Sequence, residues 1–178
     1  STGDTAESPL LRALAVVGLA TLDGPARAAG AEKIVEWHRA LPKEEMALRR
    51  LGLICLGLCD SDAKSLAYLA EITKDAMGDT DTGADTAFTS EPTGPGALMT
   101  PVLTALMTRL DSSAALLKIL EATSSKRIRE TIARTLSTRR FDPAVGALLK
   151  ALESSDRYDW QDLSRALDPL LKPTDSAG

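Results

Sequence analysis

The sequence predicts an all-α fold, a right-handed α-solenoid of about four helix-pair repeats. One observation is a junction at which an apolar helical segment ends in an aspartate and a new helix begins. The four junction residues are Asp23, Asp60, Asp111 and Asp142. Another is the segment ALLKILE at 115–121, which recurs as ALLKALE at 147–153, 32 residues later (115 to 147). A period near thirty residues, with two helices in each unit, is typical of helical repeat proteins.

The first two helices follow from their start and stop residues. Ser8 is a suitable N-cap and Pro9 suits the first helical position, so a helix is expected from there to about Leu22. After Asp23-Gly24-Pro25, a second helix is expected over 25–41, with Pro42 ending it.

The third helix is expected over 43–59, because Leu48, Leu51, Ile54, Cys55 and Leu58 recur at spacings of three and four. The fourth begins after Asp60, where Ser61 or Asp62 can cap it, and runs to about Met77.

Residues 78–96 interrupt the pattern. Gly, Thr, Asp and Pro dominate this segment and no apolar periodicity is present, which predicts an acidic loop inserted within one repeat. Helical periodicity then resumes in five segments, at 97–110, 113–122, 125–137, 143–153 and 160–171. The sequence therefore predicts a single domain over 8–172, with flexible tails at 1–7 and 173–178.

The repeat register also predicts core positions, because leucines recur three residues apart after the junction aspartates. The expected pairs are Ile34 with Trp37, Leu66 with Leu69, Leu117 with Leu120, and Leu149 with Leu152. Leu120 and Leu152 are therefore predicted to be equivalent core residues. In the same way, Arg134 and Arg165 precede the matched leucines Leu136 and Leu167 by two residues.

The segment ALRRLGLICLGLCDSDA at 47–63 ends a helix in Leu-Gly-x-x-Asp and places an alanine three residues after the aspartate. In this it resembles HEAT-like repeats, including those of the bilin-lyase type. The resemblance covers about residues 8–172, although only two of the four junctions keep the glycine. It implies an α-solenoid that serves as a binding scaffold.

Composition narrows the class of protein. The chain has 178 residues, a net charge of −4 and a pI near 5.1, which argues against a nucleic-acid binder, whose surface is usually basic.

The sequence has no run of 18 apolar residues that could span a membrane. The apolar residues 10–22 lack a basic segment before them, so they are expected to form a core helix. The sequence leaves the location open, with the cytoplasm slightly favoured. The start at Ser1 is also compatible with a removed leader.

Three sets of residues are candidates for chemistry. His38 is the sole histidine, and without a partner motif it is expected to be a solvent-facing helix residue. Cys55 and Cys59 are expected to be small buried apolar residues. Asp79, Asp81 and Asp85 have oxygen ligands at spacings that suit Ca²⁺, but the segment lacks the glycine and glutamate positions of an EF-hand. The sequence thus predicts no catalytic residue, cofactor or metal site.

The strongest local charge is basic, with six Lys or Arg residues over 126–140 opposed by Glu130 alone. A solvated helix face, a site for an acidic protein and a phosphate-binding patch are all compatible with it. In HEAT-like stacks the second helix of each unit lines the inner surface. The residues expected to bind a partner there are Arg127, Arg129, Arg134 and Arg165.

The function expected from the sequence is that of a non-enzymatic scaffold that binds a protein or peptide along a helix-lined face. The alternative is a nucleic-acid-binding module of the DNA-repair type that uses the basic segment 126–140. The sequence leaves the oligomeric state open.

Overall fold

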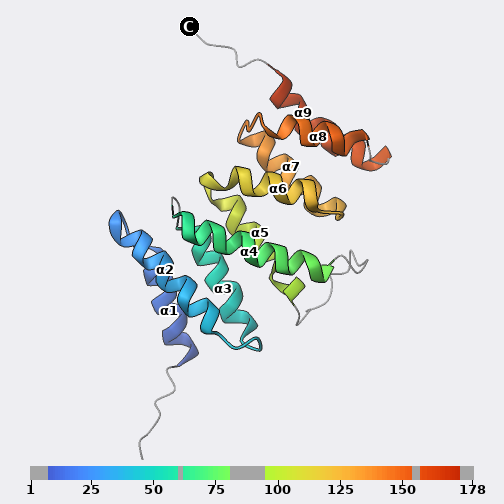
Figure 1. Ribbon diagram of the computed structural model, residues 1–178. Coiled ribbons are helices and arrows are strands. Elements are labelled where there is room, and N and C mark those ends of the chain that lie inside the picture. The colour runs from blue at the N-terminus through green and yellow to red at the C-terminus, as the bar shows by residue number, and fades with distance from the viewer. Residues whose placement is uncertain (1–7, 60–61, 81–94, 154–156, 173–178) are drawn as a thin grey trace, which may run out of the picture. The chain divides into compact units, whose positions relative to one another are not determined.

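The structure is a computed structural model that describes residues 8–59, 62–80, 95–153 and 157–172 (Figure 1). These residues form nine α-helices and short 3-10 turns, and no strand is found among them. The predicted all-α class is therefore confirmed. The chain divides into two compact units, Ser1–Asp111 and Ser112–Gly178, which are described separately below.

Unit 1 contains the first five α-helices. They are α1 (Pro9–Ala20), α2 (Pro25–Ala40), α3 (Met46–Gly57), α4 (Ala63–Thr80) and α5 (Met99–Thr108). A 3-10 turn, η2 (Pro95–Leu98), leads into α5, and another, η3 (Leu110–Ser112), follows it. Pro9 and Pro25 each occupy the start of a helix, where the missing N–H costs no hydrogen bond.

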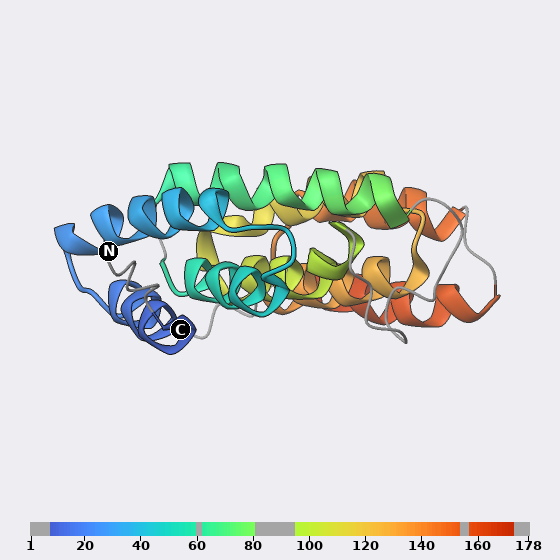
Figure 2. The same cartoon turned by 90° about the horizontal axis from the view of Figure 1, so that it is seen from below.

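The helices of unit 1 form two layers. Helices α1, α3 and α5 pack side by side in one layer, and α2 and α4 pack together in the other (Figure 2). Each helix also contacts the next one along the chain. The apolar core lies between the layers and includes Ile34, Leu53, Leu56, Leu69, Val102 and Leu106, all completely buried.

Close packing within unit 1 depends on glycine. A Cβ atom on Gly57 would lie 2.7 Å from the backbone Cα of Ala105, so only glycine permits this approach of α3 to α5. A Cβ atom on Gly30 would lie 2.7 Å from the carbonyl oxygen of Leu19, which explains the glycine where α2 meets α1. Both neighbours are backbone atoms, which cannot move aside cheaply.

Unit 2 contains α6 (Ser113–Ala122), α7 (Lys126–Thr138), α8 (Ala144–Glu153) and α9 (Arg157–Leu171). Helix α6 packs on α8, α7 packs on α9, and consecutive helices also contact each other. The buried residues of this core include Leu116, Ile132, Leu136, Leu148 and Leu163.

Helix α7 is bounded by two local motifs. At its start, the Ser125 hydroxyl accepts a hydrogen bond from the Ile128 N–H. At its end, the Phe141 N–H donates to the Leu136 carbonyl at 3.0 Å and the Arg140 N–H donates to the Ser137 carbonyl at 2.9 Å. This is a Schellman motif, and its left-handed position (φ 50°) is held by Arg140 rather than glycine.

The predicted helices agree with the observed ones to within a few residues. Differences of up to three residues occur at the start of α3 (46 rather than 43), at the start of α9 (157 rather than 160) and beside the inserted segment, where α4 continues to Thr80 and η2 begins at Pro95. Residues 78–80 and 95–96 are therefore helical rather than loop. The rest of the predicted loop, and the predicted tails at 1–7 and 173–178, lie outside the described residues.

The predicted core register is wrong at several leucines. Ile34, Leu69 and Leu120 are buried as expected, but Leu149 is 45% exposed. Four others are only half-buried, namely Trp37, Leu66, Leu117 and Leu152. Leu116 and Leu148 are buried in place of the predicted Leu117 and Leu149, and each lies one residue earlier in its helix. Neighbouring residues on a helix point about 100° apart, so a shift of one residue is enough to move a side chain out of the core.

Candidate interaction surfaces

The four arginines predicted to bind a partner lie on α7 and α9 of unit 2. Arg127, Arg134 and Arg165 are exposed, and Arg129 is half-buried. Arg127 and Arg134 are seven residues apart, so they share one side of α7 to within about 20°. Arg129 lies about 140° around the helix from Arg134. The structure therefore gives Arg129 different surroundings from the other two arginines of α7.

The matched positions of α7 and α9 have matched surroundings. Ile132 and Leu163 are both buried, and so are Leu136 and Leu167. Between them, the side chains of Arg134 and Arg165 are 73% and 76% exposed. Each arginine has a carboxylate partner on its own helix, Glu130 for Arg134 and Asp162 for Arg165. Exposed pairs of this kind contribute under about 1 kcal/mol, so another carboxylate can replace the partner at little cost.

Arg129 belongs to a separate hollow of about 520 Å³ in unit 2. This hollow is lined by residues of α6, α8 and the start of α7, including Leu120, Gly146 and Lys150. The Arg129 guanidinium donates to the Thr123 carbonyl at 3.3 Å. The basic segment 126–140 is therefore not one solvated face, because its cations point in several directions.

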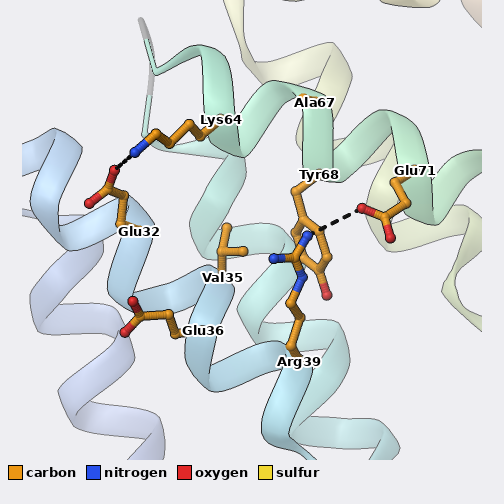
Figure 3. Close-up of a pocket in the computed structure, with 8 residues that line it drawn as sticks. All are labelled: Glu32, Val35, Glu36, Arg39, Lys64, Ala67, Tyr68 and Glu71. Carbon is orange, nitrogen blue, oxygen red and sulfur yellow. Dashed lines mark hydrogen bonds and ion pairs between the residues drawn. The ribbon is translucent and has the colours of Figure 1, made fainter.

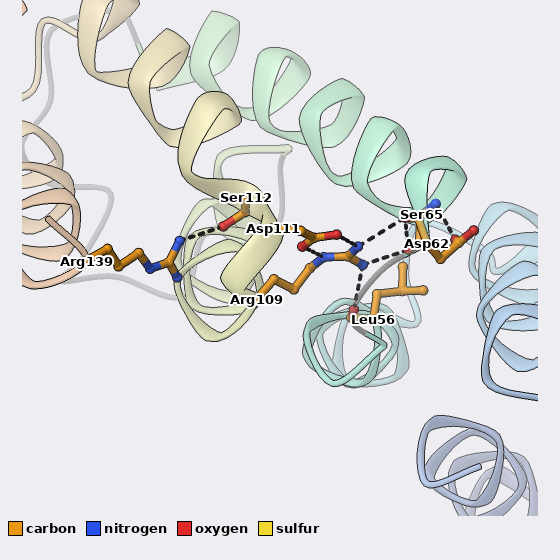
Figure 4. Close-up of polar contacts among 7 residues, drawn as sticks. All are labelled: Leu56, Asp62, Ser65, Arg109, Asp111, Ser112 and Arg139. Atoms are coloured by element: carbon orange, nitrogen blue, oxygen red, sulfur yellow. Dashed lines mark hydrogen bonds and ion pairs between the residues drawn. The ribbon is translucent and has the colours of Figure 1, made fainter. Parts of the chain in front are cut away.

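Arg139 also departs from a solvated face. Its guanidinium donates to the Ser112 hydroxyl at 3.0 Å and to the Ser113 hydroxyl at 3.2 Å, and the side chain is half-buried (Figure 4). It thus joins the end of α7 to the start of α6, which is a structural role within unit 2.

A second hollow, of about 430 Å³, lies between α2 and α4 of unit 1 (Figure 3). Its lining includes Val35 and Ala67, and the guanidinium carbon of Arg39 lies 4.7 Å from the centre of the Tyr68 ring. Ion pairs join its two walls. Lys64 of α4 pairs with Glu32 of α2, and Arg39 of α2 pairs with Glu71 of α4. Both cations of the lining are therefore paired with an acid from the opposite helix.

His38 bonds to Tyr68, which lines this hollow, and is completely buried, so the expectation of a solvent-facing histidine is wrong. Its Nε2 atom donates to the Arg49 carbonyl at 3.0 Å, which fixes the tautomer, and its Nδ1 atom accepts from the Tyr68 hydroxyl at 2.7 Å. Both ring nitrogens are therefore satisfied by a neutral imidazole. Gly52 makes room for the ring, because a Cβ atom there would lie 3.0 Å from His38 Cδ2.

Burial, together with the nearby positive charge of Arg49, lowers the pKa of His38 to about 4. Burial also raises the pKa of the Tyr68 hydroxyl. The histidine is thus neutral at pH 7 and enclosed by protein atoms, which suits a structural role rather than acid–base catalysis.

Arg109 of unit 1 makes five side-chain hydrogen bonds, and the sequence analysis did not single it out (Figure 4). It is completely buried, and all five of its N–H groups have acceptors. Two bonds, of 2.9 and 2.7 Å, go to the carboxylate of Asp111. The others go to the Leu56 carbonyl, the Ser65 hydroxyl and the Asp62 carbonyl.

This arrangement joins the end of α3, the start of α4 and the residues after α5. Leu56 is near the last turn of α3, where carbonyl groups lack partners within the helix. A signal was present in the sequence, because a Thr-Arg pair begins two residues after Leu106 and again two residues after Leu136, as Thr108-Arg109 and Thr138-Arg139. Both arginines bond to a serine at the start of another helix.

The cysteines behave as expected. Cys55 and Cys59 are buried and not disulfide-bonded, and burial raises the pKa of the Cys55 thiol to about 11. They are therefore poor nucleophiles. Within the described ranges, no three or more His, Cys, Asp or Glu side chains form a group able to hold a metal ion. Residues 81–85 of the calcium-like segment lie outside those ranges.

None of the described helices is both long and apolar enough to cross a membrane. Comparison with models of protein families, with curated proteins and with solved structures finds no match to this chain.

Proposed function

We propose that the chain is a non-enzymatic scaffold of HEAT-like helix pairs, an α-solenoid that binds a protein or peptide partner through α7 and α9. The observation that carries the proposal is the equivalence of these two helices. Both bury apolar residues at matched positions, and both expose an arginine between them. Repeated units that present the same side chain outward are typical of extended binding surfaces.

The chemistry of the exposed arginines favours an acidic partner. A guanidinium can form paired hydrogen bonds with a carboxylate, and arginine is enriched among residues that contribute strongly to interfaces. Arg127 extends the basic stripe of α7, since it lies two turns before Arg134 on the same side. Arg129 is assigned to the hollow on α6 and α8 rather than to this stripe.

The packing of each unit supports the solenoid part of the proposal. In both units each helix contacts its chain neighbour and also the helix two places away. That pattern produces two layers of alternating helices, which is the arrangement expected when helix pairs stack. The proposal that the helix pairs are HEAT-like is supported by this packing together with the repeated aspartate junctions of the sequence.

The experiment combines affinity capture with charge reversal. The full chain and the double variant Arg134→Glu with Arg165→Glu are used as baits in source-cell extract, and captured proteins are identified by mass spectrometry. Each direct interaction is then measured with purified components. The double variant is expected to fold normally and to bind its partner at least about tenfold more weakly, because two favourable charge contacts become repulsive.

A matched control reverses two exposed lysines elsewhere, Lys74→Glu with Lys118→Glu. These changes alter the net charge equally and are expected to leave partner binding unchanged. Equal losses in both variants, or no loss in a folded arginine variant, would contradict the assignment of the binding face. Selective binding of oligonucleotides instead of a protein would favour the nucleic-acid alternative.

A further inference from the structure

The layer of unit 1 formed by α1, α3 and α5 exposes no charged residue within the described helices. Large apolar side chains are exposed on two of these helices. Leu10 is 66% exposed, Leu14 59% and Val17 43% on α1, and Ile54 is 45% exposed on α3. On α5 the exposed residues are threonines, including Thr104 and Thr108. We call the exposed residues of α1, α3 and α5 the uncharged face.

The other layer of the same unit is the opposite in character. The exposed residues of α2 and α4 are charged side chains interspersed with alanines, and the charged ones include Lys33, Glu36, Arg39, Lys64, Glu71 and Lys74. Ion pairs link several of them, as between Arg39 and Glu71. Unit 1 is therefore two-sided, and only one side has the composition of an ordinary solvated surface.

The charged residues of α1 and α3 are turned away from the uncharged face or are partly covered. Arg12 of α1 donates to the carboxylate of Glu45 at 3.0 Å, so its positive charge is paired within the unit. Arg49 and Arg50 of α3 are half-buried. The threonines also present little polarity, because the Thr104 and Thr108 hydroxyls each donate at 2.9 Å to a backbone carbonyl four residues earlier. Their methyl groups are then left for contact.

We propose that the uncharged face is the interface at which two copies of this chain associate about a two-fold axis. A two-fold axis sets a surface against the same surface of the second copy, so any charge would meet a like charge. An uncharged apolar face avoids that repulsion and is complementary to itself. The charge pattern argues against a lipid surface, since a membrane-binding face usually carries basic residues and this face has none exposed.

The size of the face agrees with a weak dimer. The three helices have 12, 12 and 10 residues, which corresponds to lengths of about 15–18 Å. At an interaxial spacing of 8–10 Å, three helices cover a width of about 25–30 Å, or roughly 450 Å² in each copy. Two such faces bury about 900 Å², close to the smallest specific interfaces. A single partner helix would cover only about a third of that width.

The spacing on α1 supports direct helix packing across the axis. Leu10, Leu14, Val17 and Thr21 follow one another at intervals of four, three and four residues, the pattern of a coiled-coil seam. Gly18 lies beside this seam and has no neighbouring atom within 4 Å of a Cβ position, so a second helix has room to approach.

The test is sedimentation velocity of the full chain at concentrations from about 1 to 300 µM, which bracket a dissociation constant on the order of 10 µM. The monomer has a mass of 18.8 kDa, and the expected result is a reversible shift to twice that mass as concentration rises. The variants Leu14→Glu and Ile54→Glu are each expected to weaken association at least about 100-fold, because a carboxylate would be buried without a partner.

Leu149→Glu is the matched control, since Leu149 of unit 2 is as exposed as Ile54, at 45%. It is expected to leave the dissociation constant unchanged. Circular dichroism of each variant checks folding, and Thr104→Lys provides a milder change on the same face if either glutamate variant unfolds. A chain that stays monomeric to 300 µM overturns the proposal. A dimer that tolerates the substitutions on the uncharged face, or that the control disrupts equally, overturns it as well.

Discussion

At the scale of single residues, His38 links the stability of unit 1 to pH. Its imidazole donates to one acceptor and accepts from one donor, so protonation would place a second N–H against the Tyr68 hydroxyl and a charge in the core. The folded pKa of about 4 lies below the ordinary value of 6.5, so the unfolded chain binds more protons in that interval. Stability is therefore full above pH 6.5 and decreases as the pH falls toward 4.

We expect the free energy of unfolding to decrease by about 2 kcal/mol between pH 7.5 and pH 5. Urea denaturation at the two pH values measures the change. His38 is the chain's one histidine, so His38→Asn leaves no histidine side chain to titrate in this range. The variant will be less stable at pH 7.5, but its stability should change much less with pH. An equal pH dependence in both proteins would disprove the role of His38.

Arg109 is the second residue whose burial has a measurable consequence. Arg109→Met removes five hydrogen bonds and leaves the Leu56 and Asp62 carbonyls and the Ser65 hydroxyl without this donor. We expect a loss of about 3 kcal/mol or more, the usual cost of breaking a buried ionic network.

Thermal or urea denaturation measures the effect of Arg109→Met. Arg39→Met is the comparison, because Arg39 also pairs with an acid but its side chain is 59% exposed. It should cost under about 1 kcal/mol. Similar losses in the two variants would mean that the Arg109 network adds little. Arg109→Lys should not restore full stability, because an ammonium group has three donors rather than five.

At the scale of helices, the approach of α3 to α5 depends on the absence of a side chain at Gly57. Gly57→Ala would place a Cβ atom 2.7 Å from the Ala105 Cα, so the helices must separate. We expect a loss of about 1–3 kcal/mol. Gly146→Ala on α8 is the control, because nothing lies within 4 Å of its Cβ position, and it should be neutral or stabilise by up to about 1 kcal/mol. Equal effects would show that the contact is not tight.

The repeat register of α8 gives a second prediction at this scale. Leu148 is completely buried and Leu149 is 45% exposed, although they are adjacent. Leu148→Ala should therefore cost about 2–5 kcal/mol, whereas Leu149→Ala should cost under about 1 kcal/mol. Chemical denaturation of both variants tests this difference. A larger loss of stability for Leu149→Ala than for Leu148→Ala would support the core register predicted from the leucine spacing.

At the scale of the whole molecule, the division into two compact units makes its own prediction. Unit 2 has four helices and a core that includes Leu116, Ile132 and Leu163. We expect a fragment of residues 112–178 to be helical by circular dichroism and to melt cooperatively. Its stability should be low, since a domain of this size buries only about 60% of its surface. A fragment with no melting transition would show that this core requires the rest of the chain.

The sequence predicted much of the helical structure because the signals for helices are local. The N-cap at Asp62, the prolines at helix starts and the three-and-four spacing of apolar residues each depend on a few neighbouring positions. The segment 113–122 was predicted with the observed bounds of α6. The exposed Arg134 and Arg165, too, followed from comparing one repeat with the next.

The sequence by itself thus determined the all-α class and the order of the helices. Only the tertiary structure decided that His38 is buried, that Leu148 rather than Leu149 faces the core, and that Arg109 joins three segments. The reason is physical, because Arg109 bonds to residues 44 to 53 positions away in the sequence. The uncharged face also depends on tertiary structure, because α1, α3 and α5 are separated in the sequence and lie side by side only in the folded unit.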